Sequence, residues 1–272
     1  MKTLSILRFA LSPLLLIGLI QLSACQADVP DPIPDPEPDP YEAHVLVGQA
    51  QDGNISIDVY ADEALYAGYN TLYIKVMEGD IETKKADVML KPMMDMTTMV
   101  HSCPVEQPQL NDDNLIEAHV LFQMPSMGGA WELNINVKME DGAEHDFNMP
   151  IEVVQPEFTR AIVSTVEGKK LILGYVDPME PKVGENDFEV AIYTMKDMMT
   201  FEPVEGLSIK MEPEMPSMGH GSFGNIDPIE TVNGHYKGTV VFNMVGDWRI
   251  HMEVQEKGVV IKDGIYFDLY FQ

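Results

Sequence analysis

The chain has 272 residues, of which 44 are acidic and 17 basic, so its formal net charge at pH 7 is −27. So acidic a surface repels nucleic acid and anionic lipid head groups, which excludes nucleic acid binding as an expected function and leaves cations and cationic proteins as plausible partners. Methionine is abundant, with 20 residues, while cysteine occurs only twice.

Residues 1–24 have the pattern of an export signal. Two basic residues precede an apolar run at 9–19, which is too short for a transmembrane helix, and residues 22–25 read Leu-Ser-Ala-Cys. These four residues resemble a bacterial lipobox, which implies cleavage before Cys25 and a lipid anchor on its thiol. We therefore expect a bacterial outer membrane lipoprotein that faces the periplasm or the cell surface. A secreted protein cleaved nearby is the alternative.

Residues 25–40 form the next segment, an acidic tether. Proline recurs at every second residue from Pro30 to Pro40, which excludes a helix and favours extended polyproline II geometry. An acidic stretch after a lipidated cysteine resembles a surface-export signal in some bacterial groups, and a plain spacer explains it equally well.

The sequence after the tether predicts two domains, at residues 41–155 and 156–272, because segments of one half correspond to segments of the other. Residues 117–124 correspond to 235–244, and residues 130–137 correspond to 247–254. The boundary falls near Pro156.

Period-two alternation predicts strands throughout both domains. Trp131 to Val137 and Trp248 to Val254 place every second side chain on an apolar face. Further strands are predicted at 55–60, 71–76, 87–90, 147–153, 171–176, 188–193, 207–211 and 265–271. Six or seven short antiparallel strands per domain indicate an all-β fold, two tandem immunoglobulin-like β-sandwiches after the signal peptide and the tether.

Two copies of the pattern Met-x-x-Met-x-His stand 119 residues apart. Their members are Met96, Met99 and His101, and Met215, Met218 and His220. Thioethers bind Cu(I) far better than hard cations, and imidazole also suits copper, so the pattern predicts a Cu(I) site. Both copies follow predicted strands that end near Leu90 and Met211, and are therefore expected in loops. A loop folded over the sandwich end, with its methionines as packing, is the alternative.

Cys103 lies two residues after His101 and is the only cysteine left once Cys25 carries a lipid, so no intramolecular disulfide is expected. As a thiolate it would be the strongest Cu(I) ligand of the first set. The second copy has Ser222 at that place. Cys103 is therefore either a ligand particular to the first domain or a small buried apolar residue.

The second domain carries a family resemblance. Residues 215–220 read Met-Pro-Ser-Met-Gly-His, a Gly-x-Tyr element begins at Gly234, and a Gly-x-Trp element ends at Trp248. This succession, within residues 170–255, resembles the YtkA-like/FixH-like domain family. The resemblance implies a small extracytoplasmic immunoglobulin-like domain, often found near copper handling or cytochrome-oxidase assembly, and it implicates Met215, Met218 and His220.

The first domain, a divergent second copy, departs from that pattern. It has Thr97 and Val100 where the second domain has Pro216 and Gly219, and it lacks the Gly-x-Tyr element. It also carries an extra Met-Pro-Ser-Met-Gly-Gly at residues 124–129. We therefore expect the two domains to differ in metal affinity, or one domain to bind while the other supports it.

No hydrolase, phosphate-binding or redox motif is present in the sequence, so we do not expect an enzyme. Two functions remain. The chain is a lipid-anchored copper-binding protein that captures Cu(I) or delivers it to a copper-receiving envelope protein, or it is a tandem immunoglobulin-like interaction module whose methionines serve as packing.

Overall fold

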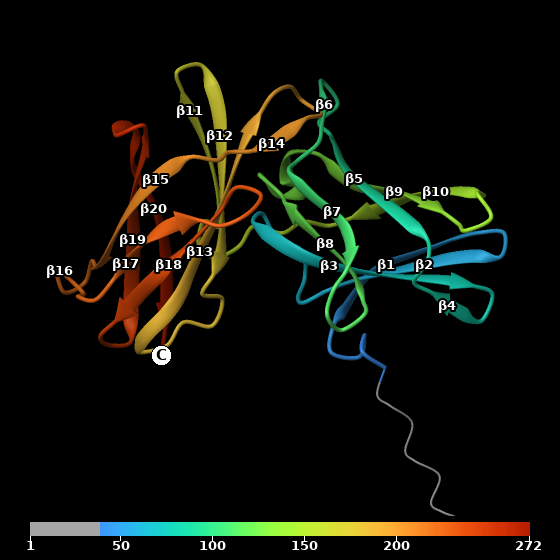
Figure 1. Ribbon diagram of the computed structural model, residues 1–272, viewed down its shortest axis with the longest axis horizontal. Helices are drawn as coiled ribbons and strands as arrows, with labels where there is room; N and C mark the ends of the chain where they lie inside the picture. The colour runs from blue at the N-terminus through green and yellow to red at the C-terminus, as the bar shows by residue number, and fades with distance from the viewer. Residues whose placement is uncertain (1–38) are drawn as a thin grey trace, which may run out of the picture. The chain divides into compact units, whose positions relative to one another are not determined.

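The computed structural model describes residues 39–272, and these are all-β apart from one 3₁₀ turn (Figure 1). The expected signal peptide, Cys25 and most of the tether lie outside the described residues. Within residues 39–272, no helix is long and apolar enough to cross a membrane.

The first half forms two antiparallel sheets, with strand orders β1-β2-β3-β8-β7 and β10-β9-β5-β6, and β4 pairs with β3. The elements are β1 (Val45–Asp52), β2 (Ile55–Ala61), β3 (Tyr69–Glu78), β4 (Ile81–Thr83), β5 (Asp87–Asp95), β6 (Val100–His101), β7 (Val105–Leu110), β8 (Ile116–Leu121), η1 (Ser126–Gly128), β9 (Ala130–Lys138) and β10 (Glu144–Ile151).

The second half repeats this topology, with orders β11-β12-β13-β18-β17 and β20-β19-β15-β16, and β14 pairs with β13. Its strands are β11 (Ala161–Val166), β12 (Lys169–Asp177), β13 (Gly184–Met195), β14 (Phe201–Pro203), β15 (Leu207–Met215), β16 (His220–Gly221), β17 (Ile226–Glu230), β18 (His235–Phe242), β19 (Gly246–Glu256) and β20 (Val259–Phe271). Each strand occupies the place of the strand numbered ten lower, so the halves are two copies of one immunoglobulin-like sandwich. The expected boundary at Pro156 falls between β10 and β11.

The core of each sandwich lies between its two sheets. Trp131, Leu133, Ile135 and Val137 on β9 are all buried, as the alternation predicts, and the same holds for β19 from Trp248 to Val254. They pack against apolar residues of the opposite sheet, including β2 and β3 in the first half. Fully burying such a side chain contributes roughly 1.5–3 kcal/mol, so these inward faces dominate the stability of each half.

Two strands continue through a proline past the end that the sequence predicts, because the missing N–H of each proline interrupts no hydrogen bond between strands. In β5 the backbone N–H of Leu90 donates to the side-chain oxygen of Gln107, on the side away from β9. Pro92 has the same parity, so its missing N–H also faces that sheet edge, where proline is tolerated. In β15 the N–H of Met211 likewise turns to Asp227, and Pro213 follows. The predicted ends at Leu90 and Met211 were therefore too early.

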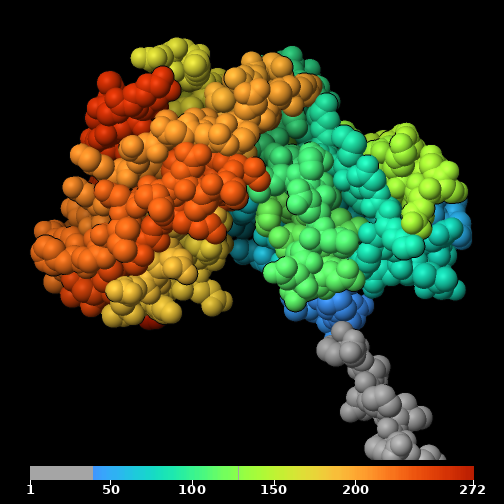
Figure 2. Space-filling view, in the orientation of Figure 1, coloured from blue at the N-terminus to red at the C-terminus, as the bar shows by residue number. Residues whose placement is uncertain are grey.

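The contacts between the two halves include an apolar cluster and a backbone hydrogen bond. Leu121 of β8 packs into the space above Gly174 of β12, where a Cβ would lie 2.7 Å from the leucine Cδ1. The N–H of Ser102, just after β6, donates to the carbonyl oxygen of Met198 in the β13–β14 connection at 2.8 Å. Figures 1 and 2 show this connection beside β6.

Candidate functional site

Both Met-x-x-Met-x-His motifs lie on hairpins at sheet edges, instead of the irregular loops expected from the sequence. In the first half the turn closes with a hydrogen bond from the N–H of Met96 to the carbonyl oxygen of Met99 at 3.0 Å. In the second half the N–H groups of Met218 and Gly219 both donate to the carbonyl oxygen of Met215. Each histidine lies on the short edge strand of its hairpin: His101 is the last residue of β6, and His220 is the first residue of β16.

A common row of three side chains crosses the end of each sheet. In the first half His101 pairs with Met94, and Met94 pairs with Trp131 of β9. In the second half His220 pairs with Met215, and Trp248 of β19 is next in register, because Glu214 pairs with Arg249. The structural counterpart of Met215 is therefore Met94, not Met96.

The first hairpin is two residues longer than the second, which explains the mismatch. Met94 and His101 are seven residues apart, whereas Met215 and His220 are five apart. Met96 belongs to the extra length; it is half-buried against the first core. Counting back from the histidine, Met99 and Met218 correspond, and both are exposed, at 48% and 60%.

The two histidines are held in the same orientation. Nδ1 of His101 lies 2.9 Å from the carbonyl oxygen of Ser102, and Nδ1 of His220 lies 3.0 Å from that of Gly221. A carbonyl only accepts, so Nδ1 donates its hydrogen, and in the neutral ring Nε2 keeps a free lone pair. Within residues 39–272, neither Nε2 makes a hydrogen bond. Metal-binding histidines are oriented in this way.

A glycine two residues before each tryptophan makes room for the strand methionine. A Cβ on Gly246 would lie 2.5 Å from Cε of Met215, and a Cβ on Gly129 would lie 3.2 Å from Cε of Met94. Each thioether is thus held over the start of β19 or β9. The indole N–H of the tryptophan donates to a methionine carbonyl in the preceding turn, at 3.0 Å in both halves.

Each histidine also meets the tryptophan of its row edge-on. The ring centroids of His101 and Trp131 lie 5.5 Å apart, and those of His220 and Trp248 lie 6.3 Å apart. Each hairpin provides one imidazole, one buried thioether and one exposed thioether. This set of donors fits Cu(I) and fits hard cations poorly. Among residues 39–272, no three His, Cys, Asp or Glu side chains converge as metal ligands.

Access differs between the hairpins. His101 is only 7% exposed and Met94 is fully buried, whereas His220 is half-buried beside an exposed turn. The two hairpins belong to different sandwiches, and β6 and β16 lie well apart in Figure 1, so the two Met/His sets do not come together. The β15–β16 hairpin lies at the surface on the left of Figures 1 and 2.

Cys103 lies within the first core cluster, at 3% exposure, and not on the hairpin. Burial raises the pKa of its thiol well above the ordinary value, so the thiol is protonated at neutral pH.

Met94 was missed because the predicted strand stopped at Leu90. Continuing the alternation through Pro92 would have placed Met94 on the inward face.

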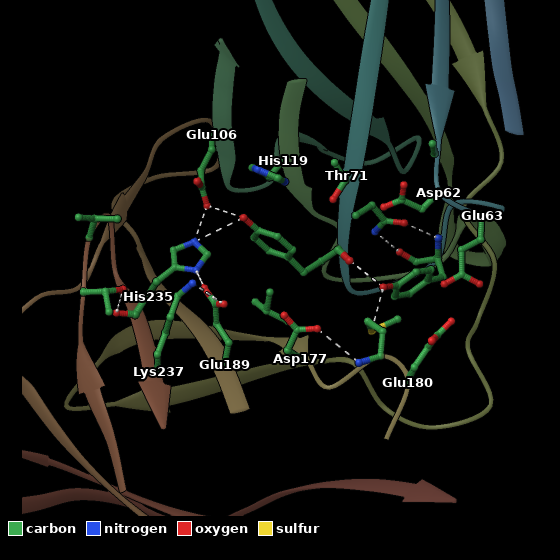
Figure 3. A pocket seen from close by; sticks show the side chains of 18 residues that line it. Asp62, Glu63, Thr71, Glu106, His119, Asp177, Glu180, Glu189, His235 and Lys237 are labelled. Atoms are coloured by element: carbon green, nitrogen blue, oxygen red, sulfur yellow. Dashed lines mark hydrogen bonds and ion pairs between the residues drawn. The ribbon is translucent and has the colours of Figure 1, made fainter. Parts of the chain in front are cut away.

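A polar cluster around His235, which no sequence pattern predicted, links the two halves (Figure 3). Nε2 of His235 on β18 lies 2.7 Å from Glu106 of β7, and Nδ1 lies 2.5 Å from Glu189 of β13. The hydroxyls of Tyr69 and Tyr193 donate to the same Glu106 oxygen at 2.8 and 2.6 Å. Both nitrogens of His235 therefore donate, and the ring is positively charged.

The pKa values of this cluster follow from its contacts. Burial lowers the pKa of His235, but hydrogen bonds to Glu106 and Glu189 outweigh it and raise the pKa to about 9. Burial raises the pKa of Glu106, and the hydrogen bonds it accepts from His235 and the two tyrosines lower it to about 2. Lys237 adds an ion pair to Glu189 at 2.9 Å. The cluster lines a cavity of about 750 Å³. Because its ion pairs link the two halves, we call the cluster of His235, Glu106 and Glu189 the joint.

Two of the solved structures that are similar to this chain show the range of the likeness. One is FdeC, an adhesin of Escherichia coli, at 16% identity and a TM-score of 0.25, over 79% of this chain and 63% of that chain. The other contains titin domains I67–I69 in a mutated variant, at 9% identity and a TM-score of 0.18, over 74% of this chain and 62% of that one. The chain thus spans less than two thirds of either structure.

A comparison with curated proteins finds no match. Among protein families, residues 174–253 match the one described as YtkA-like. The second copy expected in the first half is not detected, although the two halves share one topology. The matched span runs from β12 into β19 and includes Met215, Met218, His220 and Trp248. The second sandwich of this chain is a YtkA-like domain.

Proposed function

We propose that the protein binds Cu(I) at its two hairpins and acts as a copper-capturing or copper-delivering protein of the bacterial envelope, without enzymatic activity. The observation that carries the proposal is the matched orientation of His101 and His220. Each donates Nδ1–H to the next residue's carbonyl and keeps Nε2 free beside methionine thioethers. In both halves a glycine also lies close to Cε of the strand methionine.

The proposed ligands of the first site are His101, Met94 and Met99, and those of the second are His220, Met215 and Met218. When bound, Cu(I) would be the cargo, and the chain would supply soft sulfur donors and one imidazole. The buried methionine is held in place over its glycine, while the exposed methionine on the turn is free to move. Thioethers and a single imidazole favour exchange with a partner over permanent storage.

The envelope location is part of the proposal. The lipobox-like residues 22–25 support lipidation of Cys25, and the acidic tether supports a distance between the sandwiches and the membrane surface. The turn of the second hairpin and the nearby Phe223, which is 94% exposed, support a contact surface for a copper-receiving protein.

The test is an anaerobic Cu(I) titration of the mature chain against a competing chelator. The chain is expected to bind two Cu(I). A variant with Met94→Leu and Met99→Leu, and one with Met215→Leu and Met218→Leu, are each expected to bind one, because leucine preserves volume and removes sulfur.

The matched control carries Met198→Leu and Met199→Leu, which lie outside both hairpins and are 37% and 39% exposed. This control is expected to bind two Cu(I) like the unmodified chain. Absence of tight binding in the unmodified chain, or equal binding by the folded hairpin variants, would overturn the proposal and favour a tandem interaction module.

A further inference from the structure

The first half contains a methionine motif that neither hairpin uses. Residues 124–128 read Met-Pro-Ser-Met-Gly, identical to residues 215–219, which form the second hairpin's turn. In the first half the same five residues form the β8–β9 connection and include η1. The second half connects β18 to β19 by a shorter turn after Phe242. The first half therefore carries this five-residue sequence in the connection that leads into β9, the strand of Trp131, and not in its β5–β6 hairpin.

The register of the sheet places this connection beside the first hairpin. Ala130, at the start of β9, pairs with Asp95, at the end of β5, so η1 and the β5–β6 turn leave adjacent strands at the same end of one sheet. Gly129 is packed so closely that a Cβ would collide with the carbonyl oxygen of Asp95 and meet Cε of Met94. The indole N–H of Trp131 also ties this connection down through the carbonyl oxygen of Met124.

The backbone of η1 is held from its other side as well. The N–H of Ser126 donates to the carbonyl oxygen of Val153 at 2.8 Å, and the N–H of Val153 donates to the hydroxyl oxygen of Ser126 at 2.9 Å. Yet the side chain of Met127, on this anchored turn, is 90% exposed. A large apolar side chain on a fixed support has no packing role there, and its three rotatable bonds let the thioether take several positions at this end of the sheet.

We propose that Met127 is an additional thioether ligand of Cu(I) at the first hairpin, an inference that rests on the proposed function. The first site then takes sulfur from two separate connections around Trp131, whereas the second takes all its ligands from one hairpin. Because an added soft ligand strengthens Cu(I) binding, the first site retains copper and the second exchanges it. The longer first hairpin and the buried His101 agree with this division.

The experiment uses the mature chain carrying Met215→Leu and Met218→Leu, so that only the first site binds. In that background Met127→Leu is compared with Met89→Leu, a matched control at 59% exposure on β5. Met127→Leu is expected to weaken Cu(I) binding at least about tenfold, since even residues that only support a ligand matter by 10–100-fold. Copper X-ray absorption is expected to show one sulfur fewer. Met89→Leu leaves both values unchanged.

Thermal unfolding of both variants checks that each keeps the fold, which is expected for apolar exchanges at exposed positions. Equal affinity and equal sulfur count for Met127→Leu and Met89→Leu would overturn the role of Met127 and leave the proposed function intact. No Cu(I) bound in this background would overturn the first site and this inference with it. No Cu(I) bound by the unmodified chain would overturn the proposed function itself.

Discussion

The two hairpins share the row of histidine, methionine and tryptophan but differ in their surroundings. The first is longer, its histidine is 7% exposed, and the residue after it is hydrogen-bonded to the second sandwich. The second is short, and its turn residue Met218 is 60% exposed. The sheet that both halves share therefore orients the potential ligands. The length of each hairpin and its contacts decide how far solvent reaches them.

The largest expected effect concerns the joint that holds the two sandwiches together. His235→Gln leaves the half-buried Glu106 and the buried Glu189 without their shared cation, and removing one partner of a buried ion pair costs up to about 3–5 kcal/mol. Urea unfolding of the variant is expected to show that loss. The control Lys237→Gln removes an ion pair whose lysine is 57% exposed, and is expected to cost about 0.5 kcal/mol or less. A loss below 1 kcal/mol for His235→Gln would mean that the halves do not depend on this joint.

The same joint predicts a pH dependence. The pKa of His235 is raised from 6.5 to about 9 by Glu106 and Glu189, so its stabilising contribution is full below pH 6.5 and is lost as pH rises through 9. The loss is on the order of 3 kcal/mol. For Glu106 the pKa is lowered from 4.5 to about 2, so its contribution is present above pH 4.5 and is lost as pH falls through 2. Urea unfolding between pH 6 and 10 checks the first of these, and His235→Gln should remove the alkaline slope.

A single glycine, Gly246, leaves room for Met215 in the second hairpin. Gly246 has φ of 130°, and a Cβ there would press on Cε of Met215, so Gly246→Ala is expected to cost about 2 kcal/mol and to weaken Cu(I) binding at the second hairpin. Gly142→Ala is the control, because it has positive φ but open space around it, and is expected to cost about 1 kcal/mol without affecting copper. Unchanged copper affinity in Gly246→Ala would contradict a role for the placement of Met215.

The smallest effect on the fold is expected from oxidation, which reports access directly. Dilute hydrogen peroxide should convert Met218 to the sulfoxide several-fold faster than the fully buried Met94, as followed by peptide mass spectrometry. Met99 is expected to react at a rate near that of Met218. Equal rates for Met94 and Met218 would show that the first hairpin opens freely in solution.

The sequence predicted the architecture where apolar alternation was strong. Strand 130–137 lies where expected because one of its faces is buried, and strand 188–193 lies within the longer β13, where all six residues are buried. It missed β1, β7, β11 and β17, whose residues are mostly exposed or half-buried and so carry little alternation, and it missed the strands of two or three residues, β4, β6, β14 and β16. It also ended β5 and β15 too early at their prolines, since nothing local tells whether a missing N–H faces a neighbouring strand or a sheet edge.

The candidate site was predicted in part. Met99, His101, Met215, Met218 and His220 lie on the two hairpins, because the spacing to the histidine is a local property. Met94 was missed, since spacing alone cannot reveal that the first hairpin is two residues longer. The cluster around His235 depends on residues 129 and 46 positions away, and contacts at such separations leave no local trace.

The proposed ligands of the second hairpin lie within six consecutive residues, from Met215 to His220. Closing so short a loop costs little chain entropy, and the cost rises only slowly with length, so the longer first hairpin loses little by comparison. The sandwich does not need to bring distant parts of the chain together to present these side chains. The rest of the sandwich, through Gly246 and Trp248 of β19, then has only to orient these side chains.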